Sequence, residues 1–363
     1  MNKIVSVLGK LAFLFKKKNI ILNPKNILII RSGAIGDVLM TTPFLKAIRN
    51  RFPKAEISYL VGNYSKKILD GNKNIDRVIN FDDDIVYKKK VFDTVRLIKQ
   101  IKKERFDLCF VLDKSYHWGI LSYFFGIKNR IGFDRHGEGF AYHKTVFFDG
   151  GKYELEYNLD LAKLVNAKIS DKKMELFISK LDEQFSEEII NKNALNSKIM
   201  IGIAPGGAKN PGQEMDAKRW PIEKYIELTK ELIKNNNVLI FGGPGDIEFG
   251  KKITSEIKSD KIIDLTGKTT IQQSAALIDR CKYFITHDSG LMHIAATTNT
   301  KIIALFGPTP AHRFAPKDAS VIQIEDKECP CYDVYGNYKK CKNVECMNQI
   351  RTKDILEIVN NEN

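Results

Sequence analysis

With 363 residues, the chain is too long for one small hydrophobic core, so we expect two domains. Hydrophobic residues make up 43% of it and no residue type dominates, which excludes an intrinsically disordered chain and favours a globular protein. The 58 Lys and Arg against 44 Asp and Glu give a net charge of +14, which suits an anionic partner but equally fits lysines scattered over a solvated surface.

Residues 1–23 form an amphipathic N-terminal extension. Its apolar part is interrupted by Gly9 and Lys10 and stops at three lysines, so it is too short to span a bilayer. Lys10 also breaks the apolar core that a signal peptide needs. Residues 1–18 would form either a peripheral contact with an anionic leaflet or a surface helix packed on the protein's own body. One helix face would carry Ile4, Leu8, Leu11 and Phe15.

From residue 24 the chain alternates between strands and helices, which predicts a parallel, doubly wound domain over residues 24–175. Residues 168–197 are charged and lack a long apolar run, so we expect a linker there. The strands of this domain are "NILIIR", "EISYLVG", "RVINF" and "FDLCFVLD".

The stretch "RSGAIGDVLMTTPF" places Asp37 in the first turn of a helix that follows a strand. A carboxylate there could cap the helix or act as a general base that takes a proton from an attacking hydroxyl. Gly33 and Gly36 are the only glycines of this turn, so it does not match the dinucleotide-binding fingerprint. Pro43 should kink the helical run.

A second alternating series predicts another doubly wound domain over residues 198–348, followed by a C-terminal helix over 349–363. Ligands of such domains bind outside the carboxyl ends of the strands. The loop "GGAKNPGQEMDAKRWP" supplies Lys209, Lys218 and Arg219 near that edge. These cations could bind a diphosphate, although Lys209 is better explained as a solvated loop lysine.

The stretch "HDSGLMH" puts the backbone N–H groups of Ser289, Gly290 and Leu291 at a helix N-terminus, where they could cradle a phosphate. His293 lies one turn further and could reach the same anion or a ribose. Asp288 would repel a phosphate, so we expect it to accept a hydrogen bond from a sugar hydroxyl instead. The alternative is a capped helix with an incidental histidine.

The six cysteines are too few for a disulfide framework in a chain of this length, which favours a reducing, cytoplasmic setting. Four of them cluster late in the chain and could hold a structural zinc ion, or could be reduced thiols or form a stray disulfide. These four are Cys329, Cys331, Cys341 and Cys346.

The order of these motifs resembles glycosyltransferase family 9, the bacterial ADP-heptose lipopolysaccharide heptosyltransferases. The resemblance covers residues 26–350 and rests on "RSGAIGDVLMTTPFLKAIRNRFP", "AKRWP", "FGGPGD", "DLTGKTTIQQSAALI" and "HDSGLMHIAA". It implies an α/β GT-B fold, in which an acceptor-binding and a nucleotide-sugar-binding Rossmann-like domain face an interdomain cleft. It also implies inverting transfer of a heptose from ADP-heptose to a Kdo or heptose hydroxyl of the lipopolysaccharide inner core.

The resemblance assigns roles residue by residue. Asp37 matches the family's general base, Lys218 its phosphate-binding lysine, and Asp246 an acidic residue that binds ribose. The nucleotide-sugar segment matches Asp288, Ser289, Gly290, Leu291 and His293. A phosphorylated Kdo acceptor would need cations from the first domain, and the candidates are Arg31, Lys114, His117 and Arg130.

No acidic pair of the Asp-x-Asp kind stands near these motifs, so we expect no cofactor and metal-independent chemistry. We expect a cytoplasmic enzyme, peripheral on the inner face of the cytoplasmic membrane, that acts on a lipid-linked glycan. One alternative is a GT-B transferase with another nucleotide sugar or a non-lipopolysaccharide acceptor. The other is a non-catalytic basic protein that binds nucleic acid, which is disfavoured because the charge is not concentrated in a reading helix.

Overall fold

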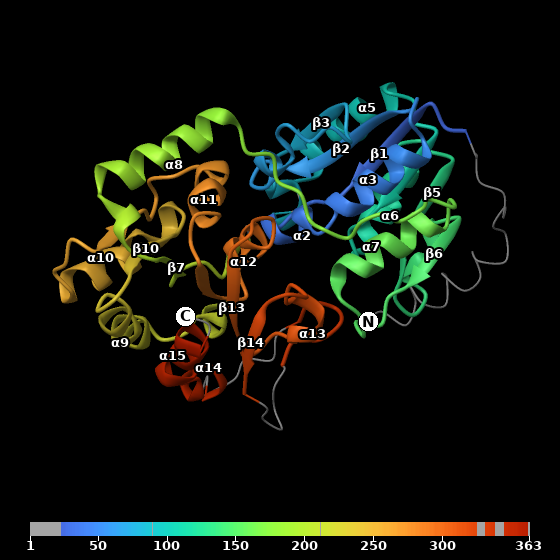
Figure 1. Cartoon of the computed structure of the whole chain (residues 1–363). Coiled ribbons are helices and arrows are strands. Elements are labelled where there is room, and N and C mark those ends of the chain that lie inside the picture. The colour runs from blue at the N-terminus through green and yellow to red at the C-terminus, as the bar shows by residue number, and fades with distance from the viewer. Residues whose placement is uncertain (1–22, 89, 211, 325–330, 338–344, 362–363) are drawn as a thin grey trace. The chain divides into compact units, whose positions relative to one another are not determined.

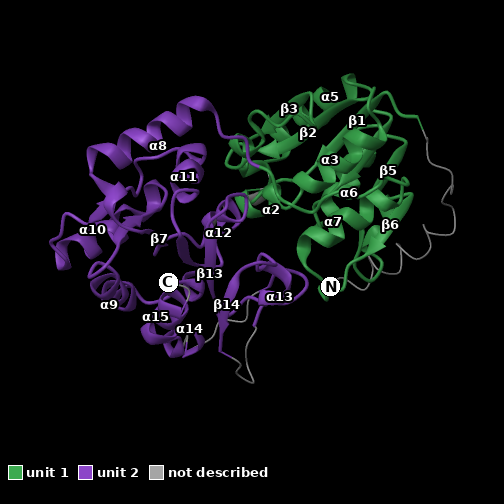
Figure 2. Ribbon diagram, in the orientation of Figure 1, with its two compact units in different colours: residues 1–175 green, residues 176–363 purple. Residues whose placement is uncertain are grey.

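The computed structural model describes residues 23–88, 90–210, 212–324, 331–337 and 345–361. The expected membrane-contacting residues 1–18 and two of the four late cysteines, Cys329 and Cys341, lie outside this range. The chain divides into two compact units, residues 1–175 and 176–363 (Figure 2). Each unit is built around one six-stranded sheet (Figure 1).

The sheet of the first unit has the strand order β3-β2-β1-β4-β5-β6, and all its strand pairs are parallel. Helix α3 packs against α7, and α5 packs against α6. Its strands are β1 Asn26–Ile30, β2 Glu56–Gly62, β3 Arg77–Phe81, β4 Leu108–Val111, β5 Asn129–Asp134 and β6 Lys144–Phe147. Its helices are α2 Ile35–Leu39, α3 Thr42–Arg51, α4 Asp84–Tyr87, α5 Val91–Lys103, α6 Tyr116–Phe124 and α7 Glu154–Lys163, with 3₁₀ turns η1 Lys66–Leu69 and η2 Glu138–Ala141.

The helical run that contains Pro43 is interrupted, as its sequence predicts. Helix α2 ends at Leu39, and α3 starts at Thr42 with Pro43 in its first turn. Proline is tolerated there because the first amide groups of a helix have no intrahelical acceptor. The interruption leaves α2 as a short helix that carries Asp37 at the edge of the sheet.

The sheet of the second unit repeats this topology, with the order β11-β10-β7-β12-β13-β14. The small antiparallel pair β8–β9 lies in the loop that follows β7. The strands of the second unit are β7 Met200–Ala204, β8 Lys209–Asn210, β9 Gln213–Glu214, β10 Asn237–Ile240, β11 Ile262–Asp264, β12 Tyr283–His287, β13 Lys301–Phe306 and β14 Ser320–Gln323. Its helices are α8 Lys180–Lys192, α9 Ile222–Leu232, α10 Ile247–Glu256, α11 Ile271–Ile278, α12 Gly290–Ala295, α13 Ala311–Phe314, α14 Glu345–Gln349 and α15 Thr352–Asn361, with 3₁₀ turns η3 Leu195–Ser197, η4 Asp216–Lys218 and η5 Pro244–Asp246.

Two parallel, doubly wound sheets confirm the predicted α/β class. Their central strands, such as β1, β4, β7 and β12, are almost completely buried. Strands covered on both faces need continuous apolar runs rather than alternating ones, which is the pattern that made them visible in the sequence.

The linker that we expected over residues 168–197 is wrong for its second half, because Lys180–Lys192 form α8. Ser179 and Asp182 make a reciprocal capping box: the Ser179 N–H donates to the Asp182 carboxylate at 3.0 Å, and the Asp182 N–H donates to Ser179 Oγ at 3.3 Å. The helix packs against α11 and buries Ile190. The Ser-x-x-Asp signal is present in the sequence, but the charged surface of the helix obscured it.

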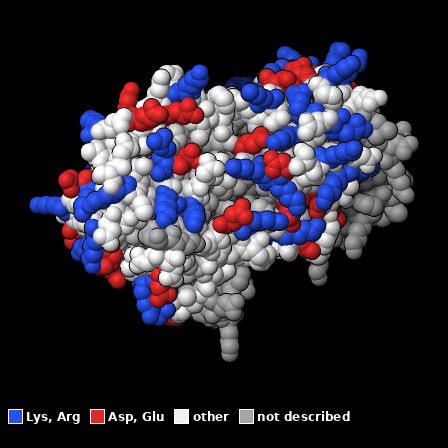
Figure 3. All heavy atoms as spheres, in the orientation of Figure 1, with Lys and Arg blue, Asp and Glu red and all other residues white. Residues whose placement is uncertain are grey.

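None of the helices in the described part of the chain is long and apolar enough to cross a bilayer. On the face shown in Figure 3, basic side chains are interspersed with acidic ones over both units. On this face the net positive charge is therefore spread out rather than gathered in one patch.

Candidate functional site

Three predicted residues of the first unit, Arg31, Asp37 and Lys114, lie together at the carboxyl edge of its sheet. Arg31 directly follows β1, and Lys114 follows the neighbouring strand β4. The chain order reverses between these two strands, and ligands of doubly wound sheets bind at such a switch point.

Asp37 is held on both carboxylate oxygens. Its Oδ1 lies 2.6 Å from Nη2 of Arg31, and its Oδ2 accepts the N–H of Ala34 at 3.0 Å. Burial raises the pKa of Asp37, but the charges of Arg31 and Lys114 together with these hydrogen bonds outweigh it and hold the pKa at about 2. The side chain keeps 29% of its surface exposed, so Asp37 is an ionised carboxylate that a ligand can reach.

The two cations beside Asp37 are themselves tied to the protein. Arg31 donates from Nη1 to the carbonyl oxygen of Leu112 at 2.9 Å. Lys114 pairs with Glu154, the 2%-exposed first residue of α7, and its Nζ lies 4.8 Å from the centre of the Phe148 ring. Both cations are thus held in place near Asp37, where their positive charges lower its pKa. Sequence reasoning missed Glu154, because it stands in an ordinary helical pattern.

The other two acceptor candidates have different positions. His117 is exposed in the first turn of α6 and bonds to Ser115, in the same β4–α6 connection as Lys114. Arg130 is in register with Cys109, which is near the amino end of β4, and its guanidinium donates to the carbonyl oxygens of Ile127 and Ala141. The structure thus does not bring Arg130 to the Asp37 cluster, and we remove it from the acceptor candidates.

A second charged cluster lies at the equivalent edge of the second unit. Asp288 follows β12 and Lys218 ends η4, and their side chains form an ion pair of 2.7 Å. Asp288 and Lys218 are 8% and 18% exposed. Burial raises the pKa of Asp288, but the charge and hydrogen bond of Lys218 outweigh it, so the pKa lies below its usual value and the carboxylate is ionised.

The turn after Asp288 starts α12. Ser289 is its N-cap, because its Oγ accepts the N–H of Met292 at 3.4 Å. Gly290 and Leu291 follow and are partly exposed, whereas His293 is buried close enough to Asp288 to lower the pKa of that carboxyl. The capped-helix alternative thus describes Ser289 correctly, and a phosphate-binding role for the next amides stays a prediction.

Asp246 joins two turns of the second unit. Its oxygens accept the N–H of Gly207, after β7, at 2.7 Å and the N–H of Gly243, after β10, at 2.8 Å. Arg219 donates to the carbonyl oxygen of the same Gly207 at 2.8 Å. Gly207 has φ of +88°, and a Cβ on it would lie 3.2 Å from that of Ser289, so glycine is required where this turn approaches α12. A ribose contact of Asp246 would have to use the remaining lone pairs of its carboxylate.

Sequence reasoning also missed an aromatic side chain beside Lys218. Nζ of Lys218 lies 5.8 Å from the centre of the Tyr332 ring. On the same ring, Arg313, which is 4% exposed, stacks at 5.7 Å, and Phe314 makes an edge contact at 5.8 Å. Tyr332 follows the late Cys-x-Cys pair, but nothing in that local pattern indicates a contact with Lys218, which only the folded chain shows.

Of the late cysteines, Cys331 and Cys346 are described. The N–H of Cys331 donates to the carbonyl oxygen of Pro308 at 3.0 Å, and Cys346 is buried beside Gly307. The described residues contain no group of three or more His, Cys, Asp or Glu side chains that could hold a metal ion. Because Cys329 and Cys341 are outside this set, the structural zinc site stays a prediction.

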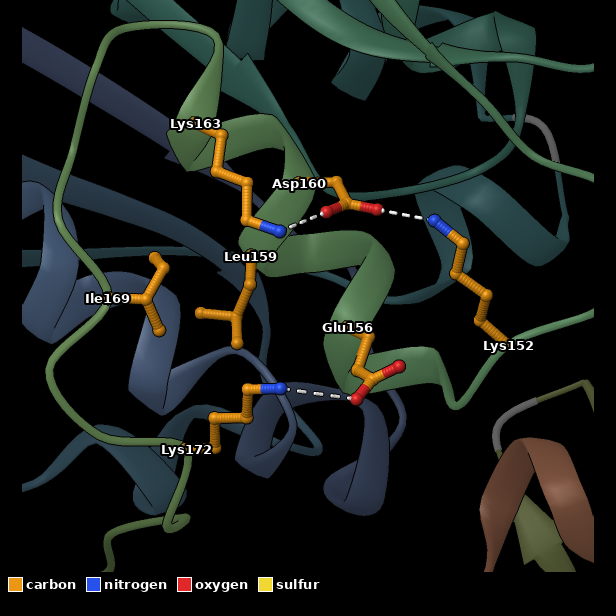
Figure 4. A pocket seen from close by; sticks show the side chains of 7 residues that line it. All are labelled: Lys152, Glu156, Leu159, Asp160, Lys163, Ile169 and Lys172. Atoms are coloured by element: carbon orange, nitrogen blue, oxygen red, sulfur yellow. Dashed lines mark hydrogen bonds and ion pairs between the residues drawn. The ribbon is translucent and has the colours of Figure 1, made fainter.

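A shallow pocket of about 220 Å³ lies beside α7 in the first unit (Figure 4). Its three lysines each pair with a carboxylate: Lys152 and Lys163 lie 2.8 Å from Asp160, and Lys172 lies 3.3 Å from Glu156. These pairs compensate the lysine charges, and we assign no ligand to this pocket.

Comparison with known proteins shows similarity to one family. A sequence profile of glycosyltransferase family 9 (heptosyltransferase) matches residues 94–344. Lipopolysaccharide heptosyltransferase 2 of Escherichia coli K12 is 28% identical over 295 residues, covering 78% of this chain and 83% of that protein.

Two solved structures are similar over nearly the whole chain. The E. coli ADP-heptose lipopolysaccharide heptosyltransferase II has a TM-score of 0.72 at 25% identity, covering 93% of this chain and 98% of that one. A family 9 glycosyltransferase from Veillonella parvula DSM 2008 has a TM-score of 0.78 at 22% identity, covering 94% and 98%. These likenesses confirm the predicted GT-B fold class.

Proposed function

This chain belongs to glycosyltransferase family 9, and from that membership we propose that it transfers a heptose from ADP-heptose to a hydroxyl of the lipopolysaccharide inner core. The observation that supports this proposal best is a charged cluster at the same topological position of each unit, Arg31–Asp37–Lys114 in one and Lys218–Asp288 in the other. The first offers an ionised base and the second offers a cation for a diphosphate. In this proposal residues 24–175 bind the acceptor and residues 198–348 bind the nucleotide sugar.

The proposed reaction inverts the anomeric centre. The acceptor hydroxyl oxygen attacks the anomeric carbon from the face opposite the diphosphate, the bond from that carbon to the diphosphate oxygen breaks, and the hydroxyl proton passes to Asp37. A carboxylate whose pKa is about 2 is a weak base. The proton therefore moves late, once the new bond has made the attacking oxygen acidic.

The leaving ADP gains negative charge that the second unit must stabilise. Lys218 has three N–H donors and uses one on Asp288, so others can face the diphosphate. The amides of Gly290 and Leu291, at the start of α12, are the proposed second contact. The remaining lone pairs of the Asp288 carboxylate can then accept a hydrogen bond from a heptose hydroxyl. These groups allow the chemistry to proceed without a metal ion.

The proposed acceptor sets the location of the enzyme. An inner-core acceptor carries lipid, so we propose that the protein works as a peripheral enzyme on the cytoplasmic face of the inner membrane. Residues 1–18 of the N-terminal extension, with their apolar face and basic flank, are the proposed membrane contact. Arg31, Lys114 and His117, which lie at or near the Asp37 edge, remain the proposed acceptor-binding residues.

Calorimetric titration of ADP and ADP-heptose, against UDP- and GDP-sugars, tests the donor assignment. We expect binding selective for ADP nucleotides that EDTA leaves unchanged, because Lys218 rather than a cation meets the diphosphate. Asp288→Ala should abolish selective ADP-heptose binding. Equal binding of all nucleotides would favour the alternative of another donor sugar, and loss of binding with EDTA would contradict the metal-independent mechanism.

Tyr332 provides a prediction that depends on the tertiary structure alone. Tyr332→Ala removes the ring beside Lys218, and we expect the donor KM to rise by roughly threefold to tenfold, in line with a cation–π contact. Tyr332→Phe keeps the ring and should restore the wild-type value. Tyr335→Ala, in the same turn but 37% exposed, is the matched control and should leave KM unchanged. Equal KM values for the two alanine variants would show that Tyr332 does not border the donor.

A further inference from the structure

The exposed face of α5 is apolar in its first turns and basic in its later turns. Its first turns expose Val91, Phe92 and Val95, whose surfaces are 69%, 90% and 44% accessible. Its later turns expose only polar and basic residues on the same face, among them Lys99, Lys102 and Lys103. At 3.6 residues per turn these positions share one side of the helix. The opposite side, with Leu97 and Ile101, is buried in the core of the first unit.

The basic residues of this face are available to a partner. Within the described part of the chain, Lys99, Lys102 and Lys103 have no carboxylate partner. Arg96, whose side chain is 83% exposed, forms a long ion pair of 3.7 Å with Asp93 one turn earlier. Protruding apolar side chains beside exposed cations supply the two contributions that bind a peripheral protein to an anionic bilayer, apolar burial and attraction to the headgroups.

The apolar part of α5 faces the same edge of the sheet as Asp37. Lys90, the N-cap of α5, pairs at 3.0 Å with Asp82, which directly follows β3. The helix then leads back to the amino end of β4 (Figure 1). Val91 and Phe92 therefore lie at the carboxyl end of the strands, the end that carries Arg31 and Asp37.

We propose that the exposed face of α5, Val91, Phe92 and Val95 with Lys99, Lys102 and Lys103, docks on an anionic lipid surface. The three apolar side chains are too few for a stable protein interface, which buries about 800 Å² per partner. They are enough for insertion that the lysines support electrostatically. This surface is distinct from residues 1–18 and goes beyond the proposed function. Docking through α5 would bring the Asp37 edge to a lipid-linked acceptor at the leaflet, and only this consequence rests on the proposed function.

Vesicle cosedimentation of the full chain tests the proposal. The probes are vesicles of phosphatidylcholine alone and vesicles with about one-third phosphatidylglycerol. We expect wild type to prefer the anionic vesicles, and Val91→Ser/Phe92→Ser to lower its partition coefficient there by roughly tenfold. Lys99→Gln/Lys102→Gln/Lys103→Gln should remove the preference for anionic lipid.

Two matched variants isolate the surface. Leu181→Ser on α8 and Phe124→Ser on α6, which replace side chains 76% and 53% exposed, should bind vesicles as wild type does. All variants keep residues 1–18, so differences between them report on α5. Wild-type binding by the double serine variant, or no preference of wild type for anionic vesicles, would overturn the proposal. So would self-association through α5 without vesicle binding, which would make the partner a protein. Because plain lipids are the probe, failure here is distinct from failure of the sugar transfer.

Discussion

Asp37→Asn is expected to lower kcat by about 10²- to 10⁴-fold, the range that a general base contributes. Asparagine keeps the shape of the side chain and can still accept a hydrogen bond from Arg31, but it cannot take the hydroxyl proton. ADP affinity should not change, because the proposed ADP site lies in the other unit. The measurement is steady-state transfer to the acceptor together with calorimetric ADP binding. Asp70→Asn, at an exposed position of the same unit, is the control and should keep full activity.

The pH dependence follows from the same contacts. Because the charges of Arg31 and Lys114 outweigh burial and hold the pKa of Asp37 at about 2, Asp37 stays ionised and should cause no acid limb in kcat above about pH 4. Arg31→Gln removes the strongest of these charges, so an acid limb should appear and move upward. A wild-type acid limb above about pH 5 that Arg31→Gln does not shift would assign the titration to another group.

The depressed pKa of Asp37 also affects stability. A carboxyl that is more acidic when folded stabilises the protein above its unfolded pKa of about 3.9. This contribution is fully present at neutral pH and is lost as the pH falls through that value toward about 2. Asp37→Asn should therefore make the free energy of unfolding less dependent on pH in this window, which acid titration followed by circular dichroism would measure.

Lys218→Gln is expected to have the second large effect, weakening ADP binding and lowering kcat by about 10²- to 10³-fold, as the loss of one transition-state donor does elsewhere. The variant leaves Asp288 8% exposed without its cation. An ionised carboxylate would then repel the diphosphate, and breaking the pair should also cost about 3 kcal/mol of stability. Donor kcat/KM and thermal unfolding are the two measurements.

A double variant separates these two consequences. Lys218→Gln/Asp288→Asn removes both charges, so it should recover much of the lost stability but not the affinity for ADP. Lys209→Gln, in the loop between β7 and η4, controls for a general loss of positive charge and should behave as wild type. If the double variant bound ADP as wild type does, Lys218 would have only a structural role.

Local patterns were sufficient to predict much of this protein. Apolar runs in buried parallel strands and helical spacing between them gave the α/β class and both sheets. The turns after these runs also indicated Asp37, Lys218 and Asp288 as candidates, because ligands of such sheets bind at the strand ends. Pro43 marked the break between α2 and α3 for a local reason as well. Strands β5 and β6 were not among the four predicted for the first unit, and α8 was missed although its signal, a capping box, stands in the sequence.

The tertiary structure alone decided which side chains meet. Lys114 and Glu154 are 40 residues apart, Lys218 and Asp288 are 70 apart, and Tyr332 reaches Lys218 from still further along the chain. Arg130 occurs in a family-like stretch, yet its strand register places it away from Asp37. Periodicity reports only the nearest few residues, whereas these pairings depend on strand order and register. The sequence alone therefore determined most of the elements and the charged residues at their ends. The strand order decided that Arg31 and Lys114 lower the pKa of Asp37, and that Lys218 neutralises the charge of Asp288.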